Sequence, residues 1–252
     1  MGQVTSDLPG SAYARSFGSE AARYERIRPP YPAAAIDFVL ANTEQPQRIL
    51  DLGAGTGKLT RSLIGRAGEV VAVEPDAQMR AVLASSVPLA SVFEGSAERI
   101  PLPTGSVDAI LVGQAFHWFS RPAADHELAR VLRPGGVIGL IWNFPDRSVD
   151  WIPQLYQATG DRDGPWSAEH ADLDPALFGD PELSTTCWEH ELAGAGALLD
   201  MVHTWSWVIT RSTREQQAVD RRLAVLVTQH AELQRPVIRM PQRTKAIRQY
   251  LQ

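Results

Sequence analysis

The spacing of hydrophobic positions divides the chain near residue 143. Before that point, short apolar runs alternate with amphipathic stretches of about ten residues. The runs predict buried strands at 48–52, 69–74, 91–93, 107–112 and 137–142. The stretches predict helices at 33–42, 58–64, 76–84 and 122–132, with a turn at 134–136. Apolar strands that alternate with helices are typical of a parallel sheet covered on both faces.

After Asn143 the alternation stops. Residues 144–183 are rich in Asp, Pro, Gly and Trp, and a segment this long predicts an insertion with local helices over a site. A strand at 185–192 and a helix at 194–203 follow. Ser212 and Glu215 have the spacing of a capping box, which predicts a helix to about residue 231. The chain is expected to end in a strand at 237–251.

Composition narrows the functional classes. The 252 residues carry a net charge of −5, which argues against a general basic surface for nucleic acid. The chain has no run of 18 apolar residues, which is the length that would predict a membrane-spanning helix, and no signal peptide is visible. Cys187 is the single cysteine, so neither an intramolecular disulfide nor a cysteine metal cluster is expected. We therefore expect a cytoplasmic protein with no membrane partner and no metal.

A buried strand ending in Asp51 runs into three alternating glycines, Gly53, Gly55 and Gly57. A phosphate-binding P-loop would need four residues between its glycines and a hydroxyl residue after Lys58, and the chain has neither. A dinucleotide-binding loop would need glycine at position 58. A tight turn without a ligand is a further alternative.

S-adenosylmethionine fits this loop better than a phosphate ligand does. It carries a cationic amino group and no phosphate, so Asp51 beside the loop becomes favourable. Glu74 ends the next strand, where an acid can accept hydrogen bonds from both ribose hydroxyls.

Four segments in order resemble the motifs of class I S-adenosylmethionine-dependent methyltransferases, specifically the methyltransferase type 11 group. They are ILDLGAGTGKLT, VVAVEPDAQM, EGSAERIPLPTGSVDAILVGQAFHWF and RVLRPGGVIGLIWN, and the resemblance covers about residues 20–143. The QAFHWF segment and the upstream Tyr24 and Arg28-Pro29-Pro30-Tyr31-Pro32 resemble the trans-aconitate-type small-molecule methyltransferases.

The resemblance implies an α/β fold: a Rossmann-like, doubly wound, mostly parallel seven-stranded sheet with helices on both faces and an inserted acceptor-side segment. We expect one domain over residues 1–252. Its parts would be an N-terminal cap (1–45), a cofactor-binding core (46–143), an acceptor-side insertion (144–183) and C-terminal strands and helices (184–252).

The resemblance also implies a set of residues that bind S-adenosylmethionine. Arg28 would pair with the carboxylate of the cofactor, Glu74 with the ribose, and Ser96 with the adenine edge, where many relatives have Asp. The full set is Tyr24, Arg28, Asp51, Gly53, Ala54, Gly55, Gly57, Glu74, Pro75, Met79, Ser96, Ala97, Glu98, Gln114 and Ala115.

His117, Trp118 and Trp142 follow or end strands and are expected to contact the methyl acceptor. His117 is the candidate catalytic base for a hydroxyl acceptor, because imidazole titrates near neutrality. Trp142, Trp151, Trp166 and Trp188 are expected to wall the acceptor site, or alternatively to fill the core of the insertion.

The predicted function is methyl transfer from S-adenosylmethionine to a small molecule, at a carboxylate or hydroxyl oxygen. The alternatives are a cofactor-binding subunit without transfer activity, and a protein or nucleic-acid methyltransferase. No basic patch with interleaved aromatic residues supports the last of these.

Overall fold

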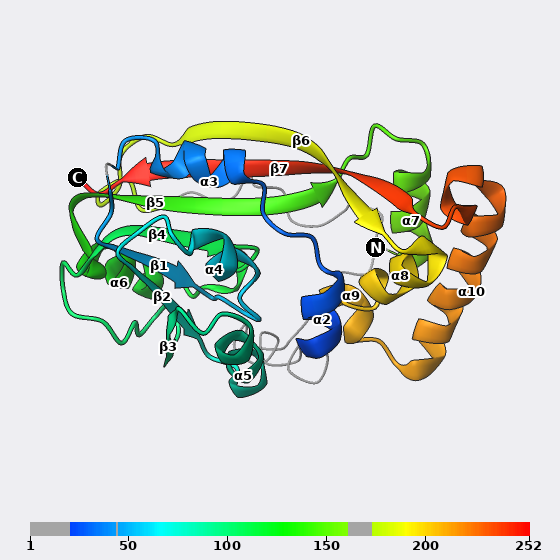
Figure 1. The fold of residues 1–252 in the computed structure, drawn as a ribbon, viewed down its shortest axis with the longest axis horizontal. Helices are drawn as coiled ribbons and strands as arrows, with labels where there is room; N and C mark the ends of the chain where they lie inside the picture. The colour runs from blue at the N-terminus through cyan, green and yellow to red at the C-terminus, as the bar shows by residue number, and fades with distance from the viewer. Residues whose placement is uncertain (1–20, 44, 161–172) are drawn as a thin grey trace.

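The computed structural model describes residues 21–43, 45–160 and 173–252 (Figure 1). Residues 1–20 of the predicted N-terminal cap lie outside this range. So do residue 44 and residues 161–172 of the predicted insertion, which include Trp166.

A seven-stranded sheet runs through the molecule in the order β3-β2-β1-β4-β5-β7-β6. The strands are β1 (Arg48–Leu52), β2 (Glu69–Glu74), β3 (Ser91–Glu94), β4 (Val107–Gly113), β5 (Leu132–Pro145), β6 (Glu182–Leu192) and β7 (Ile238–Tyr250). The first five are parallel, and β7 pairs antiparallel with both β5 and β6. The predicted doubly wound, mostly parallel fold is confirmed.

Helices cover both faces of the sheet. They are α3 (Ala33–Leu40), α4 (Lys58–Leu63), α5 (Ala77–Ser86) and α6 (Ala123–Val131). Successive side chains of a strand point to opposite faces. Ile49 accordingly packs in the cluster that includes residues of α3 and α4, whereas Leu50 packs in the cluster of α6. Asp76 caps α5 as predicted, because its side chain accepts hydrogen bonds from the backbone of Gln78 and Met79.

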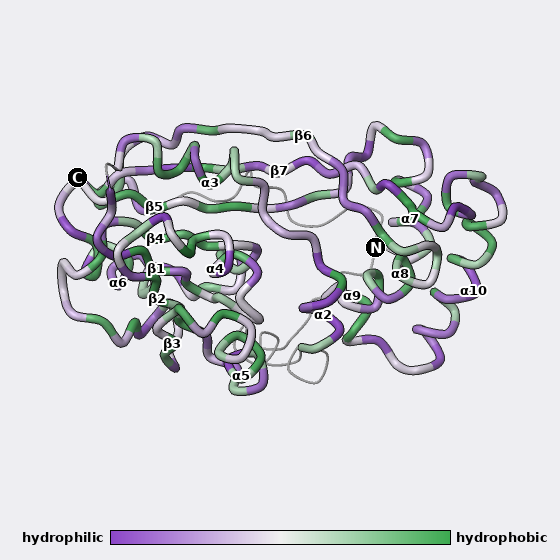
Figure 2. Tube along the Cα trace, in the orientation of Figure 1, coloured by the Kyte–Doolittle hydropathy of each residue, from purple (hydrophilic) through white to green (hydrophobic). Residues whose placement is uncertain are grey.

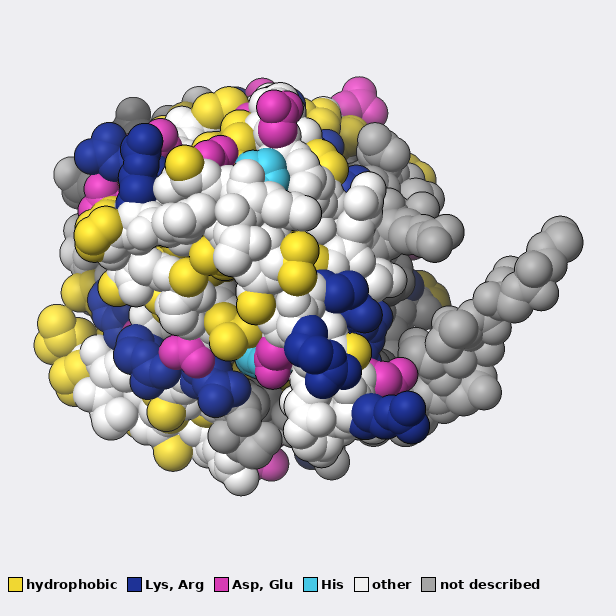
Figure 3. Space-filling view, turned by 90° about the vertical axis from the view of Figure 1, so that its right-hand side faces the viewer, with side chains coloured by type: hydrophobic (Ala, Val, Ile, Leu, Met, Phe, Trp, Pro, Cys, Tyr) yellow, Lys and Arg dark blue, Asp and Glu magenta, His cyan; other side chains and the backbone are white. Residues whose placement is uncertain are grey.

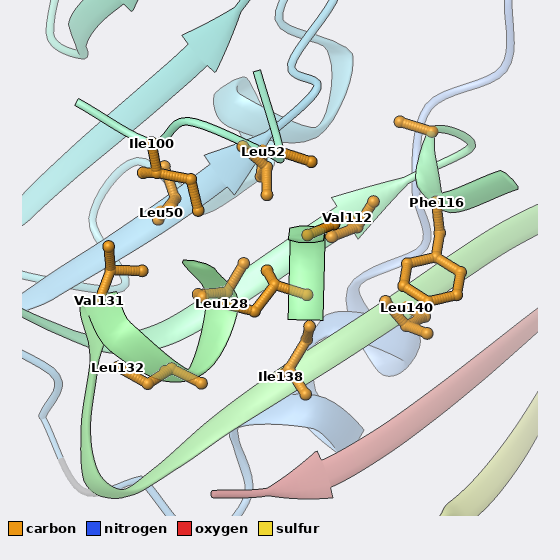
Figure 4. Packing of buried hydrophobic residues seen from close by; sticks show 14 of the residues in the cluster. Leu50, Leu52, Ile100, Val112, Phe116, Leu128, Val131, Leu132, Ile138 and Leu140 are labelled. Carbon is orange, nitrogen blue, oxygen red and sulfur yellow. The ribbon is translucent and has the colours of Figure 1, made fainter. Parts of the chain in front are cut away.

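The α6 side of the sheet has a dense apolar core (Figure 4). Leu128 and Val131 of α6 meet Leu50 of β1 and Ile138 of β5, and these four side chains are at most 1% exposed. Core side chains this well packed hold the carboxyl ends of the strands in fixed relative positions.

A second group of helices gathers at one end of the sheet, on the right of Figure 1. It contains α2 (Ala21–Ile27), α7 (Trp151–Thr159), α8 (Gly194–Val202), α9 (Ser206–Ile209), α10 (Thr213–Gln229) and the 3-10 helix η4 (Ala231–Gln234). They share one apolar core with the end of β6 and the start of β7. The predicted capping box at Ser212 and Glu215 is present, and Val219, Leu223 and Leu226 form the buried stripe of α10.

The strands differ in hydropathy along the sheet (Figure 2). β4 and β5 carry hydrophobic stretches, whereas β6 and β7 are largely mixed or hydrophilic. Side chains of β7 alternate between buried and more exposed positions, as expected where one face of an antiparallel strand pair meets solvent.

Some predicted boundaries were wrong. Residues 134–136, which were predicted as a turn before the strand, belong to β5, because this strand begins at Leu132. The pairing of β5 with β4 is irregular over this stretch. Pairing with β7 extends the other end of β5 to Pro145. The sequence patterns also did not predict α2 or α9, which are short and gain their stability from packing.

Figure 3 shows the face of the molecule at the end of the sheet where α7 to α10 lie. Its Lys and Arg side chains form separate groups with Asp and Glu between them. Within the described residues, no helix has the length and apolarity to cross a membrane, and no three His, Cys, Asp or Glu side chains are grouped to hold a metal.

Candidate active site

A cavity of about 400 Å³ opens where β1, β2, β4 and β5 end and the second group of helices begins. Most of the predicted site residues line it: Tyr24, Arg28, Gly53, Gly55, Glu74, Pro75, Met79, Ser96, Ala97, Glu98, Gln114, Ala115, His117, Trp118 and Trp142. We call the part bounded by Gly53, Gly55, Glu74 and Met79 the glycine-loop end. The part bounded by Trp142, Phe144, Tyr156, Trp205 and Trp207 is the aromatic end.

Gly53 begins the glycine-loop end in a conformation that requires glycine. Its φ is +71°, and a Cβ atom there would lie 2.6 Å from the Cβ of Ala115. The backbone N–H of Gly53 donates to the carbonyl of Val73, 2.9 Å away, which ties the loop to β2. At Gly55 a Cβ atom would meet nothing within 4 Å. The loop therefore presents bare backbone to the cavity, as close approach of a ligand requires.

Glu74 faces the cavity from the end of β2. One carboxylate oxygen accepts a hydrogen bond from the N–H of Gly55 at 2.8 Å, and the other accepts one from the N–H of Asp76 at 2.9 Å. Burial raises the pKa of Glu74, and the two backbone hydrogen bonds oppose that rise. Each oxygen has a further lone pair, so Glu74 can hold the loop and accept two ligand hydroxyls together.

Three predicted cofactor residues do not line the cavity. Asp51 is buried behind the loop, where Thr60 donates a hydrogen bond to it at 2.6 Å. This burial raises the pKa of Asp51 to about 7. Ala54 packs in a small apolar cluster that includes Leu83 of α5. At Gly57 a Cβ atom would lie 3.1 Å from Leu83 as well, so this glycine allows α5 to approach rather than a ligand.

Residues after β3 close the glycine-loop end from the other side. Ser96 and Arg99 exchange two backbone hydrogen bonds in a tight loop. Glu98 accepts a hydrogen bond of 2.7 Å from the N–H of Ser120, so it joins this loop to the segment that follows β4. Pro75 and Ala97 line the cavity between these groups.

Arg28 covers the cavity from the N-terminal side. Its Nε donates to the hydroxyl of Thr204 at 2.8 Å, and its Nη2 donates to the carbonyl of Thr204 at 2.6 Å. The guanidinium carbon lies 5.1 Å from the centre of the Tyr24 ring. The predicted partner of Arg28 was a cofactor carboxylate, but in this structure the side chain fastens the end of α2 to the turn before α9.

Gln114 follows β4 with a φ of +56°, which is uncommon for a residue other than glycine. Its side-chain amide donates to the carbonyl of Asn143 at 2.7 Å. The side chain of Asn143 in turn donates to the carbonyl of Pro30 and accepts from the hydroxyl of Thr244. The sequence did not single out Asn143. The available signal for Asn143 was that it is a polar residue at the end of an apolar run.

His117 and Trp118 lie in η2 (Phe116–Trp118), with ring centres 4.4 Å apart. Burial lowers the pKa of His117 to about 4. The expectation that this imidazole titrates near neutrality was therefore wrong, because removal from water disfavours the charged form. At pH 7 His117 is neutral and can accept a hydrogen bond.

The aromatic end differs from the predicted tryptophan wall. Of the described members of that wall, Trp142 alone lines the cavity. Trp151 is 2% exposed and packs in the helical core, and Trp188 on β6 donates to the hydroxyl of Thr244. In their place stand Tyr156, Trp205 and Trp207. The sequence offered one signal for Trp205 and Trp207, which form a Trp-x-Trp pair after a predicted helix. The spacing of this pair did not indicate that it lines the cavity.

Comparison with known proteins identifies the family. A family model described as a methyltransferase domain matches residues 50–140. An uncharacterised methyltransferase of Mycobacterium tuberculosis is 41% identical over 223 residues, covering 86% of this chain and 88% of that protein. The chain belongs to the class I methyltransferase family. An uncharacterised methyltransferase of Schizosaccharomyces pombe is 40% identical over 146 residues, covering 57% of this methyltransferase and 58% of that protein.

Solved structures share the fold at low sequence identity. A phosphoethanolamine N-methyltransferase of Haemonchus contortus, solved with S-adenosylhomocysteine, has a TM-score of 0.56 at 15% identity, covering 98% of this chain and 61% of that one. The cyclase SpnF has a TM-score of 0.51 at 17% identity, covering 94% of each chain. One fold thus serves different reactions, and the acceptor has to be inferred from the site.

The cofactor of this methyltransferase is S-adenosylmethionine. The residues present suit it, because the bare backbone at Gly53 and Gly55 leaves room for a ligand beside the loop. Glu74 offers carboxylate lone pairs to hydroxyls, and the pocket beside Met79 offers apolar surface to a flat ring.

Proposed function

We propose that this methyltransferase transfers the methyl group to an oxygen atom, carboxylate or hydroxyl, of a small molecule. The observation that carries the proposal is the single cavity that joins the glycine-loop end to the aromatic end. Its volume of about 400 Å³ is near the lower limit for pockets that hold small ligands, roughly 300–1,000 Å³. Since the cofactor takes part of this space, a folded protein or a duplex is a poor fit as the acceptor.

The glycine-loop end would hold the cofactor. Glu74 would accept the ribose hydroxyls, the backbone of Gly53 and Gly55 would lie against the methionyl part, and Ser96 would meet the adenine edge. Asp51 lies behind the loop, and a cationic amino group bound there would lower its raised pKa and so favour its charged form. When bound, S-adenosylmethionine supplies a methyl group already activated by a positively charged sulfur.

The protein would then position the acceptor, exclude water from the reacting atoms and supply one hydrogen bond. The acceptor oxygen forms the new carbon–oxygen bond with a lone pair, while the carbon–sulfur bond breaks with its electrons on sulfur. A hydroxyl acceptor loses its proton to an imidazole nitrogen of His117 or to water, and a carboxylate has none to lose. Trp118 and Trp142 exclude water around the reacting atoms, which keeps them oriented.

Two features, one of the sequence and one of the structure, favour different oxygen acceptors. The resemblance of the QAFHWF segment to trans-aconitate-type enzymes supports a carboxylate. The neutral imidazole of His117 supports a hydroxyl, because it can accept the hydroxyl proton in a hydrogen bond. In either case residues 144–183 would belong to the acceptor side, since Phe144, Pro145 and Tyr156 line the cavity.

The test has two steps. Saturating S-adenosylhomocysteine should stabilise the protein, by roughly 2.7 kcal/mol at about 100 times its dissociation constant. Release of S-adenosylhomocysteine from S-adenosylmethionine is then measured with panels of small hydroxyl compounds, carboxylic acids and amines. Release with an oxygen acceptor supports the proposal. Stabilisation without release from any panel, or release with amines alone, contradicts it.

A further inference from the structure

The aromatic end of the cavity contains two groups of rings. From the end of β5 come Trp142 and Phe144. From the helices come Tyr156, Trp205 and Trp207. Tyr156 and Trp205 are stacked with centres 5.3 Å apart and 16° between their planes, and Trp207 lies 4.9 Å from Trp205.

The helix-side rings already contact one another, so they form a continuous aromatic surface. A cage around a single cation would instead need rings held apart on several sides of it. A surface of this kind favours a flat partner that lies against it, as in offset-stacked aromatic pairs. Trp207 is the most exposed of the three and also donates a hydrogen bond to the hydroxyl of Thr159, which fixes its ring.

The charged side chains that line the cavity already have hydrogen-bond partners within the protein. Among the described residues they are Arg28, Glu74 and Glu98. Glu74 and Glu98 accept backbone N–H groups at the glycine-loop end. Arg28 directs Nε and Nη2 to Thr204. Among the described residues that line the cavity, none is a cation dedicated to a carboxylate at the aromatic rings, and an unpaired buried charge is costly. The nearby Arg147, whose guanidinium carbon lies 4.5 Å from the centre of the Tyr156 ring, is exposed and does not line the cavity.

We propose that the acceptor is an uncharged, flat aromatic compound with a ring hydroxyl, a phenol or naphthol, which stacks against Trp207 and is methylated on that oxygen. This rests on the proposed function and deepens it by choosing the hydroxyl over the carboxylate. The bond changes are those given above, with the phenolic proton passing to the imidazole of His117 or to water. The acceptor shares the cavity of about 400 Å³ with the cofactor, which favours a compact compound of one or two rings.

The first experiment measures binding without turnover, in protein saturated with S-adenosylhomocysteine. Calorimetry compares 2-naphthol with 2-naphthoate, which shares the ring system but carries a charge. We expect naphthol to bind at least tenfold more tightly. Trp207→Leu should weaken naphthol binding at least tenfold, whereas Trp207→Phe, which keeps a ring, should restore most of it.

Trp188→Leu is the matched control, because Trp188 is also half-buried and also donates its indole N–H to a threonine, but does not line the cavity. It should bind naphthol within about twofold of wild type, and S-adenosylhomocysteine affinity should be unchanged in all three variants. Tighter binding of naphthoate, binding of neither compound, or equal losses in the Trp207→Leu and Trp188→Leu proteins would overturn the inference.

The second experiment separates this inference from the proposed function. With S-adenosylmethionine present, formation of the naphthyl methyl ether supports both. Methyl ester formation from naphthoate, with no ether, overturns the aromatic hydroxyl and leaves oxygen transfer standing. Tight naphthol binding with no S-adenosylhomocysteine release from any acceptor overturns oxygen transfer, although the binding preference itself is then established.

Discussion

At the glycine-loop end, backbone groups that directly follow β1 and β2 form the surface of the cavity. At the aromatic end, side chains from the end of β5, from α7 and from the turn into α9 form it. The first kind of surface depends on a few glycines and one acid within 22 consecutive residues, Gly53 to Glu74. The second depends on how distant segments pack. We therefore expect substitutions at the two ends of the cavity to have different kinds of effect on the protein.

The largest effect is expected where the loop backbone has no freedom. Gly53→Ala combines left-handed strain of about 1–2 kcal/mol with a clash against Ala115 that costs about 1–3 kcal/mol. Gly65→Ala is the matched control, since Gly65 also has a positive φ but faces open space. Urea unfolding should show a loss of about 2–5 kcal/mol for the first variant and about 1–2 kcal/mol for the second. Equal losses would contradict the steric role of Ala115.

His117→Ala should lower turnover by roughly 10²-fold with little change in cofactor affinity. The lower part of the usual range is expected because a base with a pKa of about 4 is weak at neutral pH. His126→Ala, on the exposed face of α6, should leave turnover unchanged.

The pH profile checks the same residue. An imidazole with a pKa of about 4 is neutral above roughly pH 5, so His117 should add no titration between pH 6 and 8. The contribution of His117 to the rate should fall only as the pH drops through about 4. A limb near pH 6.5 that disappears in His117→Gln would show that the burial seen here does not persist in the working enzyme.

Glu74→Gln tests the acid of the glycine-loop end. Hydrogen bonds to a charged group contribute about 1.5–3 kcal/mol, so S-adenosylhomocysteine should bind roughly 10–100-fold more weakly. Glu94→Gln is the control, because Glu94 also ends a strand but its side chain is 76% exposed. Calorimetry on both folded variants decides the matter, and unchanged affinity in Glu74→Gln would remove this residue from the cofactor site.

The smallest effect is expected from Asp51. Burial raises its pKa from 3.8 to about 7, so the folded state binds this proton more tightly than the unfolded state does. The stability due to protonated Asp51 is complete below about pH 4 and is lost as the pH rises through 7. Between pH 5 and 7 the ligand-free protein should lose about 2 kcal/mol that Asp51→Asn does not lose. Parallel pH dependences in the two proteins would contradict this.

The sequence predicted the sheet well because buried parallel strands are short apolar runs, and β1 and β2 were predicted to the residue. It also predicted Gly53 and Glu74 at the cavity, since both directly follow or end such a strand. Trp151 and Trp207 show where prediction stopped. Trp151 lies on α7 and Trp207 on α9, both pack in or against the same helical core, and only the tertiary packing leaves the Trp207 ring partly exposed at the cavity. The lowered pKa of His117 likewise arises from burial, which the sequence did not predict.

The pairing of Leu192 with Ile238 closes the antiparallel strands β6 and β7, and the whole segment from α8 to η4 lies between these two residues. That segment is in effect one greatly enlarged hairpin loop. Its two ends stay adjacent whatever its length, so its length does not set the register of the sheet. Because its helices share an apolar core with α2 and α7, residues 193–237 can be exchanged between related enzymes only where those contacts are kept.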